Sequence, residues 1–141
     1  MVSLSNDSRP MTCPTANDLV TNYKIMKDCV FCKIALKEIP ADIVYEDNDV
    51  IAFRDAHPIA PVHILVIPKK HIASVVDISG EDTMLMGKLI ATAKKIAEDL
   101  KISEKGYKLL IRVGEHGGQE VEHIHLHLIG GARLSENIRP V

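Results

Sequence analysis

The stretch of the chain richest in chemistry is EHIHLHLIGG, residues 122–131, in which three histidines occupy alternate positions ahead of two glycines. In a β-strand alternate side chains share a face, so His123, His125 and His127 would lie together, with apolar side chains on the opposite face. A helix would scatter them around its axis, so the pattern favours a strand. An imidazole near neutral pH can be nucleophile, base or acid, which suits a row of them to attack phosphorus and protonate the departing group.

Two other interpretations of these histidines remain. A surface strand could be polar on one face by chance, although such strands usually draw on Thr, Lys and Glu. Histidine is also a common metal ligand. However, same-face neighbours in a strand repeat about every 6.6 to 6.8 Å. The outer two rings would therefore stand too far apart to bind one ion together with the middle ring without distortion.

The loop GEHGGQEV, residues 114–121, leads directly into the histidines. Gly117 and Gly118 permit backbone conformations closed to other residues and let a ligand approach the main-chain amides. Converging amides form an anion site, and Gln119 could add a neutral donor beside them. An ordinary glycine turn is the better interpretation of the loop alone. The three adjacent histidines reverse that preference and favour an anion site.

Cys29 and Cys32 form the motif CVFC, which has the spacing of half a zinc site. The sequence contains no second CxxC, so two further ligands would have to come from elsewhere, and His71 and His123 are candidates. A structural Cys2His2 zinc site is one interpretation of the motif. The other is a pair of buried thiols that pack as small apolar groups. The residue pattern does not choose between them.

The histidines need a sheet to hold them, and apolar runs along the chain predict its strands. We expect a short helix at 30–37, a hairpin of 43–47 and 50–55, an interior strand at 63–68, a long amphipathic helix at about 81–100, and strands at 107–113 and 122–129. This order predicts an α+β domain with an antiparallel sheet of about five strands. A single long helix leaves an edge and a face of that sheet uncovered, so we expect a dimer.

Composition narrows the class of protein. The 17 Lys and Arg against 19 Asp and Glu, a formal charge of −2, give no basic surface for nucleic acid. No apolar run reaches the roughly 18 to 20 residues of a membrane span, and the N-terminus lacks the features of a secretory signal. We expect a cytoplasmic protein without nucleic-acid or membrane partners. Its parts would be a mobile extension at 1–25, a domain at 26–132 and a weakly structured tail at 133–141.

The segment HIHLHLI resembles the His-x-His-x-His-x-x signature, with apolar x, of the histidine-triad (HIT) family. The resemblance runs from about Lys27 to Gly131, and EIPA, AFRD, HILVIPKKHI and HGGQEV are similar to the Hint branch, the purine nucleoside phosphoramidases. It implies a HIT-like fold and a two-fold homodimer whose sheets join into one. It also implies a purine nucleotide site on each protomer and hydrolysis of a P–N bond, of the AMP-amine or AMP-lysine type, with no cofactor required for the chemistry.

The resemblance also implies roles for the histidines. His125 would attack the α-phosphorus of an adenosine phosphoramidate and form a nucleotidyl-imidazole, from which water releases AMP or GMP. His127 matches the residue that contacts the phosphate and the leaving group. The supporting histidines of the family match His63 and His123.

The remaining site residues also follow from the resemblance. Gln119 and the amides near Val121, with Gly118 beside them, would hold the phosphate, while Asp55 would take the ribose hydroxyls. The purine would lie between Phe31, Ile34 and Phe53, which on physical grounds alone would simply be core. Some members of the family bind zinc through residues that match Cys29, Cys32, His71 and His123.

The chain departs from the family at two places. Hint proteins commonly carry Asn, which approaches the ribose and phosphate, where this chain has Arg112, and a cationic side chain there could tighten phosphate binding or point away. The C-terminal tail lacks the tryptophan of animal members. Two alternative functions stay open: hydrolysis of dinucleoside polyphosphates, as in the Fhit branch, and a nucleotide-binding scaffold. The glycines of HGGQ and of IGG after the histidines favour Hint over Fhit.

Overall fold

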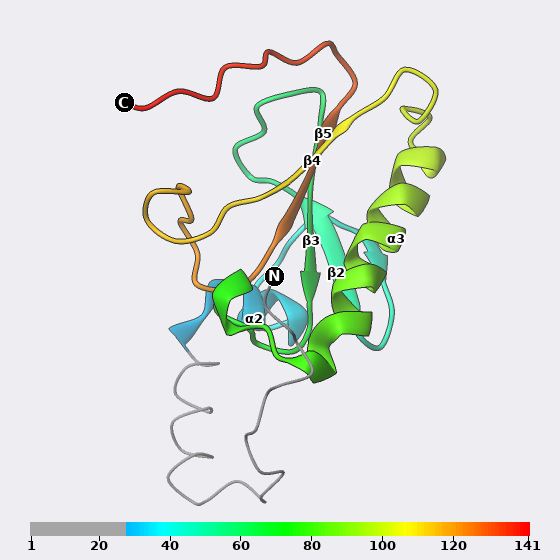
Figure 1. The fold of residues 1–141 in the computed structure, drawn as a ribbon. Helices are drawn as coiled ribbons and strands as arrows, with labels where there is room; N and C mark the ends of the chain where they lie inside the picture. The colour runs from blue at the N-terminus through cyan, green and yellow to red at the C-terminus, as the bar shows by residue number, and fades with distance from the viewer. Residues whose placement is uncertain (1–27) are drawn as a thin grey trace, which may run out of the picture.

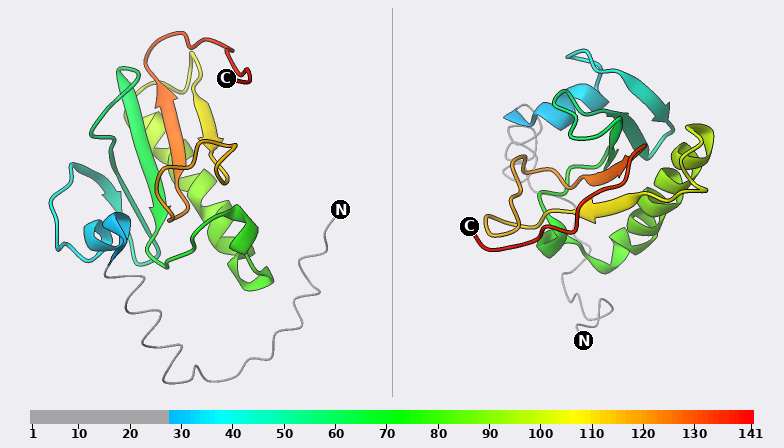
Figure 2. Two further views of the ribbon diagram at one scale, coloured as in Figure 1. Left: turned by 90° about the vertical axis from the view of Figure 1, so that its left-hand side faces the viewer. Right: turned by 90° about the horizontal axis from the view of Figure 1, so that it is seen from above.

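The computed structural model describes residues 28–141, in which an antiparallel sheet carries a helix on each face (Figures 1 and 2). In chain order the elements are α2 (Val30–Ala35), β1 (Ile43–Glu46), β2 (Val50–Arg54), β3 (Val62–Pro68), the 3-10 turns η2 (Val75–Asp77) and η3 (Gly80–Asp82), α3 (Thr83–Asp99), β4 (Lys108–Ile111) and β5 (Leu126–Gly130). The five strands follow the order β1-β2-β3-β5-β4, which leaves β1 and β4 at the edges. The predicted antiparallel sheet with one long and one short helix is confirmed.

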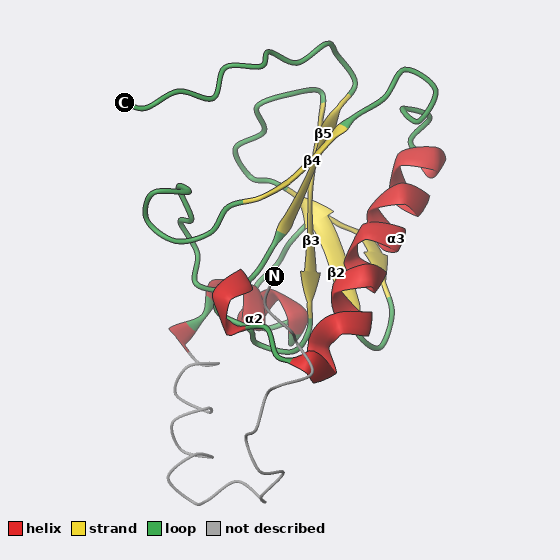
Figure 3. Cartoon of the chain, in the orientation of Figure 1, coloured by secondary structure: helices red, strands yellow, loops and turns green. Residues whose placement is uncertain are grey.

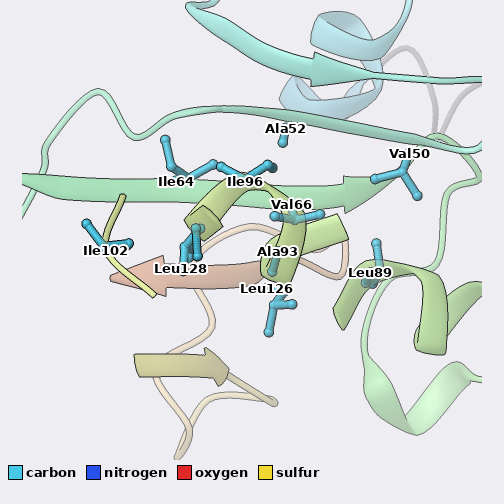
Figure 4. Close-up of a cluster of buried hydrophobic side chains, with 11 residues drawn as sticks. Val50, Ala52, Ile64, Val66, Leu89, Ala93, Ile96, Ile102, Leu126 and Leu128 are labelled. Carbon is cyan, nitrogen blue, oxygen red and sulfur yellow. The ribbon is translucent and has the colours of Figure 1, made fainter. Parts of the chain in front are cut away.

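Strands β2 and β3 are buried on both faces, and their side chains alternate between two clusters. The cluster toward α3 receives Val50, Ala52, Ile64 and Val66, together with Leu126 and Leu128 of β5. The cluster toward α2 receives Ile51, Phe53, Leu65 and Ile67. Figure 4 shows the first of these clusters, in which side chains of the sheet and of α3 converge.

Helix α3 follows from its apolar periodicity. Leu89, Ala93, Ile96 and Ala97 recur at three- and four-residue steps and are all buried against the sheet. The helix ends where Lys101 adopts φ +60 and turns the chain toward β4. The predicted helix over about 81–100 therefore differs from the observed one only at its first turn, which is the 3-10 turn η3.

Helix α2 places the cysteine motif at its own N-terminus. Cys29 caps the helix, and its Sγ accepts a hydrogen bond from the amide of Cys32 at 3.4 Å. Phe31, Cys32 and Ile34 are buried toward β2 and β3. The helix therefore brings a thiol pair and an aromatic ring to the face of the sheet opposite α3.

Strand β5 begins at Leu126, so the predicted strand over 122–129 was too long at its N-terminal end. Figure 3 shows that a loop leads into β5. The ladder between β3 and β5 ends at the pair Val66 and Leu126. Two residues further along β3 lies Pro68, which has no N–H to donate, so the ladder stops. The amide of Ile124 instead donates to the carbonyl of Ile72 at 2.7 Å.

The ends of the chain add little to the fold. The predicted extension at 1–25 lies outside the described residues, and 133–141 has no regular secondary structure. Strand β4 is shorter than the predicted 107–113. Within 28–141, no helix combines the length and apolar character needed to cross a membrane.

Candidate active site

Four buried histidines lie on the α2 side of the sheet, and three of them form a row. The ring centroids of His125 and His127 are 5.0 Å apart, and those of His127 and His63 are 5.2 Å apart. The ring of His123 lies instead 5.0 Å from the ring of His71. The row predicted from the triad alone therefore differs from the observed row, in which His63 of β3 replaces His123. The early end of the β3–β5 ladder lets His123 turn away.

His125 is held in a single tautomer by the main chain. Its Nδ1 lies 2.7 Å from the carbonyl oxygen of His123, and a carbonyl can only accept, so Nδ1 carries the proton. In the neutral ring, Nε2 therefore carries no proton and has a free lone pair. The ring also packs against the edge of Phe31, with centroids 5.2 Å apart. This arrangement fixes a nucleophilic nitrogen in a defined direction.

His63 sets the tautomer of His127 through a chain of hydrogen bonds. The amide of Ile59 donates to Nδ1 of His63 at 3.2 Å, so the proton of a neutral His63 is on Nε2. That Nε2 lies 2.9 Å from Nδ1 of His127 and donates to it. The proton of His127 is then on Nε2, a buried atom without a hydrogen-bond partner among the described residues. A buried donor without an acceptor is costly, which marks it as aimed at a ligand.

Burial keeps this pair of histidines neutral. Burial and, to a smaller extent, the neighbouring His125, His63 and Arg112 lower the pKa of His127 to about 4, with Asp55 opposing the shift. Burial also lowers the pKa of His63, and Arg112 adds to this while Asp55 opposes it. At neutral pH both rings therefore have the uncharged tautomers that the hydrogen bonds require.

Asp55 stands beside the pair, one residue after β2. Its Oδ2 lies 3.4 Å from Nε2 of His63, and its Oδ1 accepts a hydrogen bond from the amide of His57 at 2.8 Å. The amide of Asp55 donates to the carbonyl of His63 at 2.9 Å, which ties the end of β2 to β3. The side chain is about one fifth exposed, at 20%, so the carboxylate remains accessible to a ligand.

The glycine loop needs its glycines for close approach. A Cβ on Gly117 would lie 2.3 Å from the carbonyl oxygen of Val113, so no larger residue fits without moving the backbone. Gly118 has φ +76, which favours glycine, and Arg112 packs over it. The guanidinium Nη1 of Arg112 would lie 3.4 Å from a Cβ at Gly118. Arg112 therefore lies over the loop and does not point away from it.

The amides of the glycine turn are largely used within the turn. Gly118 donates to the carbonyl of Glu115 and Gln119 donates to that of Gly114, both at 3.0 Å. The turn itself therefore uses these two amides, and the expected anion site at the glycine pair stays a prediction. The amide of Val121 has no acceptor among residues 28–141, and the expectation for the amides near Val121 stays open.

The side chain of Gln119 anchors the loop. Its Nε2 donates to the carbonyls of Ala73 and Val121 at 2.7 and 2.9 Å. Its Oε1 accepts from Oγ of Ser74 at 2.8 Å and from the amide of Gly114 at 3.1 Å. The amide is thus saturated by protein groups, and a contact with phosphate would have to replace one of these bonds.

The three apolar residues assigned to the base lie together beside His125. Phe31 and Phe53 meet edge to face with centroids 5.5 Å apart, and Ile34 belongs to the same cluster. Each is nearly buried, with exposed fractions of 7%, 4% and 7% for Phe31, Phe53 and Ile34. The fold therefore brings these residues together next to His125, on the side of the row toward β2.

The predicted zinc ligands also come together. The donor atoms of Cys29, Cys32, His71 and His123 all lie within 4.8 Å of one another. Nε2 of His123 donates to the carbonyl of Pro68 at 2.8 Å, which leaves the lone pair of Nδ1 facing the two sulfurs at 3.4 and 3.5 Å. Nδ1 of His71 lies 3.2 Å from Sγ of Cys32. Two sulfurs and two imidazole nitrogens are a donor set that zinc takes.

Burial disfavours the charged forms of His123 and Cys32 in this cluster. Burial lowers the pKa of His123 to about 4, and it raises the pKa of Cys32 to about 12, with Cys29 adding to the rise. The sulfur of Cys32 is therefore a thiol, and the described cysteines form no disulfide. A bound cation would stabilise the thiolates that it ligates.

The chain belongs to the HIT domain family, which matches residues 36–134. A purine nucleoside phosphoramidase of Escherichia coli (strain K12) is 51% identical over 108 residues, which cover 77% of this chain and 91% of that protein. Protein HitA of Neisseria gonorrhoeae is 46% identical over 105 residues, covering 74% of this chain and 97% of that protein.

Solved structures agree with this assignment. A HIT family hydrolase from Legionella pneumophila Philadelphia 1 has a TM-score of 0.76 and 50% identity, covering 77% of this chain and 97% of that chain. A histidine triad protein from Clostridium difficile has a TM-score of 0.77 and 42% identity, covering 79% of this chain and 96% of that chain. The family identified from the sequence motifs is confirmed.

Backbone groups account for the functional contacts that sequence reasoning missed. The amide of Ile59 orients His63, the carbonyl of Pro68 orients His123, and the carbonyl of Ala73 holds Gln119. Every residue has a main-chain carbonyl, and every residue except proline has a main-chain N–H. The identity of a residue therefore does not reveal which main-chain groups make these contacts.

Proposed function

We propose that this protein hydrolyses the P–N bond of purine nucleoside phosphoramidates through a covalent nucleotidyl-His125 intermediate. One observation carries the proposal. Nε2 of His125 has a free lone pair, because the carbonyl of His123 holds the proton of the ring on Nδ1. The neighbouring ring of His127 has its Nε2 as a buried donor without a partner among the described residues. A nucleophile next to an unused proton donor is what displacement at phosphorus needs. The 51% identity to a phosphoramidase supports the choice of bond.

In the first step Nε2 of His125 forms a bond to the α-phosphorus, and the P–N bond breaks with its electron pair on the amine nitrogen. That nitrogen takes the proton from Nε2 of His127, and the amine leaves. His125 keeps its proton on Nδ1 and becomes a nucleotidyl-imidazolium, whose positive charge is stabilised by the carbonyl of His123. His127 is then an imidazolate, whose negative charge balances the adjacent imidazolium of His125 and is stabilised by the hydrogen bond from His63.

In the second step a water molecule attacks the phosphorus and gives one proton to Nε2 of His127. The bond between phosphorus and His125 breaks, and its electron pair returns to Nε2. The nucleoside monophosphate leaves with the oxygen of the water. Both rings regain their starting tautomers, so phosphoramidate and water have become amine and monophosphate, and no cofactor takes part in these steps.

The surroundings of His125 support a purine nucleotide as the substrate. The apolar side chains of Phe31, Ile34 and Phe53 would pack on the base, and the accessible carboxylate of Asp55 would bind the ribose hydroxyls. The free amide of Val121 would donate to the phosphate. In this placement AMP or GMP spans from the cluster near β2 to the phosphorus at His125.

The direct test is release of AMP from an adenosine phosphoramidate by the purified protein. We expect turnover of this substrate and much slower turnover of diadenosine polyphosphate. The reverse preference would support the dinucleoside polyphosphate hydrolase instead. No turnover of any phosphoramidate, together with a protein partner whose binding survives loss of His125, would support the scaffold.

We also propose a structural zinc ion at Cys29, Cys32, His71 and His123, because their donor atoms already converge. The ion would tie α2 to the segment that carries His125, and it needs reduced thiols, which persist in the cytoplasm where we place the protein. Elemental analysis of protein purified without chelator should give about one zinc per chain. A content well below that value, or zinc retained after replacement of both cysteines, would remove the proposal.

We further propose that two chains form a homodimer through β4, the edge strand next to β5. Its four residues are only partly buried in the single chain, and an unpaired strand edge is a site for pairing. Light scattering should give the mass of a dimer at micromolar concentration. A monomer mass, or a dimer that survives a proline in β4, would contradict this interface.

A further inference from the structure

Arg112 lies on the face of the sheet that carries the histidine row. Leu110 pairs with His127 in the ladder between β4 and β5, and Arg112, two residues after Leu110, shares its side of the chain. The guanidinium packs over Gly118, and its charge contributes to the lowered pKa of both His127 and His63. Arg112 therefore brings a positive charge to the histidine row from the β4 side.

The charge of Arg112 is not satisfied by any residue between 28 and 141. Arg112 forms neither an ion pair nor a side-chain hydrogen bond with another described residue. By contrast, Lys69, Lys70 and Lys88 each pair with a carboxylate at 2.6 to 2.8 Å. An exposed guanidinium with its donors free next to a reaction centre can bind an oxyanion in bidentate fashion.

The position of Arg112 relative to the base cluster indicates which part of a substrate it meets. The strand order places β2, with Phe53, on one side of the row and β4, followed by Arg112, on the other. A nucleotide whose base lies on the β2 side reaches His125 with its phosphorus. The substituent that leaves, opposite the attacking nitrogen, then extends toward His127 and the β4 side. Arg112 is thus next to the leaving group rather than the nucleoside.

We propose that Arg112 selects phosphoramidates whose leaving amine carries an oxyanion, a carboxylate or a phosphate, by binding that group on the β4 side of His127. The inference rests on the proposed phosphoramidase activity. It also predicts that an amine with a second positive charge and no anionic group, such as ethylenediamine with a free ammonium, is disfavoured because the guanidinium repels it.

The test compares matched substrate pairs that share the same P–N bond and release AMP. One pair is adenosine phosphoramidate of alanine, with its carboxylate free, against that of alaninamide. The other is adenosine phosphoramidate of phosphoethanolamine against that of ethanolamine. The wild type should prefer the anionic member of at least one pair by about tenfold or more in kcat/KM, as expected for a charge-assisted hydrogen bond. The pair with the larger ratio identifies carboxylate or phosphate.

Arg112→Asn should bring the ratio of kcat/KM for that pair close to unity, and Arg112→Lys should retain part of it. The matched control is Lys101→Asn, which removes the same charge from an exposed position after α3, where φ is +60. It should keep the ratio of the wild type. An unchanged ratio in Arg112→Asn would overturn the proposal. An equal loss of kcat/KM for both members of the pair would also overturn it, because Arg112 would then bind the phosphate at the reacting phosphorus.

Affinities separate this inference from the proposed function. Calorimetry on the His125→Ala variant, with and without Arg112→Asn, measures binding of the same four compounds without turnover. A preference for the anionic members that depends on Arg112 supports the inference even if the wild type hydrolyses none of them, in which case only the proposed activity fails. Equal affinities within each pair would reject the selectivity of Arg112 directly.

Discussion

The two faces of one sheet serve different purposes in this protein. On the face toward α3, every buried residue of the cluster is apolar, and β5 contributes Leu126 and Leu128 to it. On the face toward α2, the segment leading into β5 presents His123 to two thiols and His125 to an aromatic ring, and the strand itself adds His127. Because successive side chains of a strand point to opposite faces, the same few residues contribute to the apolar core on one face and to the candidate active site on the other.

The difference teaches how polar groups are tolerated in a buried site. Burying apolar surface stabilises the α3 face by about 25 cal/mol per Å². Burying imidazoles is unfavourable unless their nitrogens are bonded, and the second face meets this need with carbonyls, an amide and the other rings. Among buried side-chain nitrogen and oxygen atoms of the described residues, Nε2 of His127 alone lacks a partner. The protein thus leaves unsatisfied the donor that we assign to the leaving group.

Removal of His125, the proposed nucleophile, should have the largest effect on the face toward α2. His125→Ala should lower kcat on an adenosine phosphoramidate by a factor on the order of 10⁴ or more, because no other ring in the row has a free Nε2 lone pair. Steady-state release of AMP measures the loss. Retained AMP binding in the variant would show that the site is intact, whereas residual turnover near the wild-type rate would contradict the role of His125.

The matching change on the other face is Leu128→Ala. Its side chain is fully buried in the α3 cluster, so the free energy of unfolding should fall by about 2 to 5 kcal/mol. The kcat of the folded fraction should stay within a few-fold of the wild type. Urea denaturation and AMP release measure the two quantities. A stable variant with a large loss of kcat would show that the two faces are not separable.

Stability should depend on pH through the histidine face. The pKa of His127 is lowered to about 4 in the folded state, against about 6.5 when unfolded, so the unfolded chain binds the proton first. The contribution of His127 to the free energy of unfolding should therefore be constant above pH of about 6.5 and fall by up to about 3 kcal/mol as the pH drops to about 4.

Urea denaturation across this pH range measures how steeply the free energy of unfolding depends on pH. His127→Gln should show a weaker dependence than the wild type. Leu128→Ala should keep the pH dependence of the wild type at lower overall stability, because it removes no titratable group and lies on the opposite face of the sheet from the histidines. Identical slopes for His127→Gln and the wild type would indicate that His127 is not neutralised by burial.

A smaller effect is expected at His63, which acts through His127 and so is a positioning residue. His63→Leu should lower kcat by about 10²-fold, because His127 loses the donor that places its own proton on Nε2. His63→Gln, whose amide N–H can donate in the same place, should recover part of the loss with KM little changed. Equal rates for the two variants would argue against tautomer control.

The apolar periods and the β-rich runs were sufficient to predict the sheet, both helices and the α+β class, because they reflect local burial. The end of β5 was not predictable from its own residues. It depends on Pro68 in a strand almost sixty positions away in sequence, whose missing N–H ends the ladder. His123 consequently turned from the predicted row toward the cysteines, a change that no alternation pattern within 122–131 contains.

The site was predictable where it depends on residue type and less so where it depends on the main chain. The convergence of the cysteines with His71 and His123 agrees with the spacing argument. The saturation of Gln119 and the internal use of the glycine-turn amides could not be anticipated, because they arise from the path of the loop against residues 73–74. The orientation of Arg112 likewise became clear only from the register of β4 with β5.

The central claim is that phosphorus bonds transiently to Nε2 of His125, and rapid quench followed by mass spectrometry tests it most directly. The wild type, mixed with excess adenosine phosphoramidate and stopped in base within the first turnover, should carry the mass of one adenylyl group on the peptide containing residues 122–131. Fragmentation should place that group on His125. An adenylyl group on a different residue, or AMP release in a first turnover that leaves every peptide unmodified, would contradict the account.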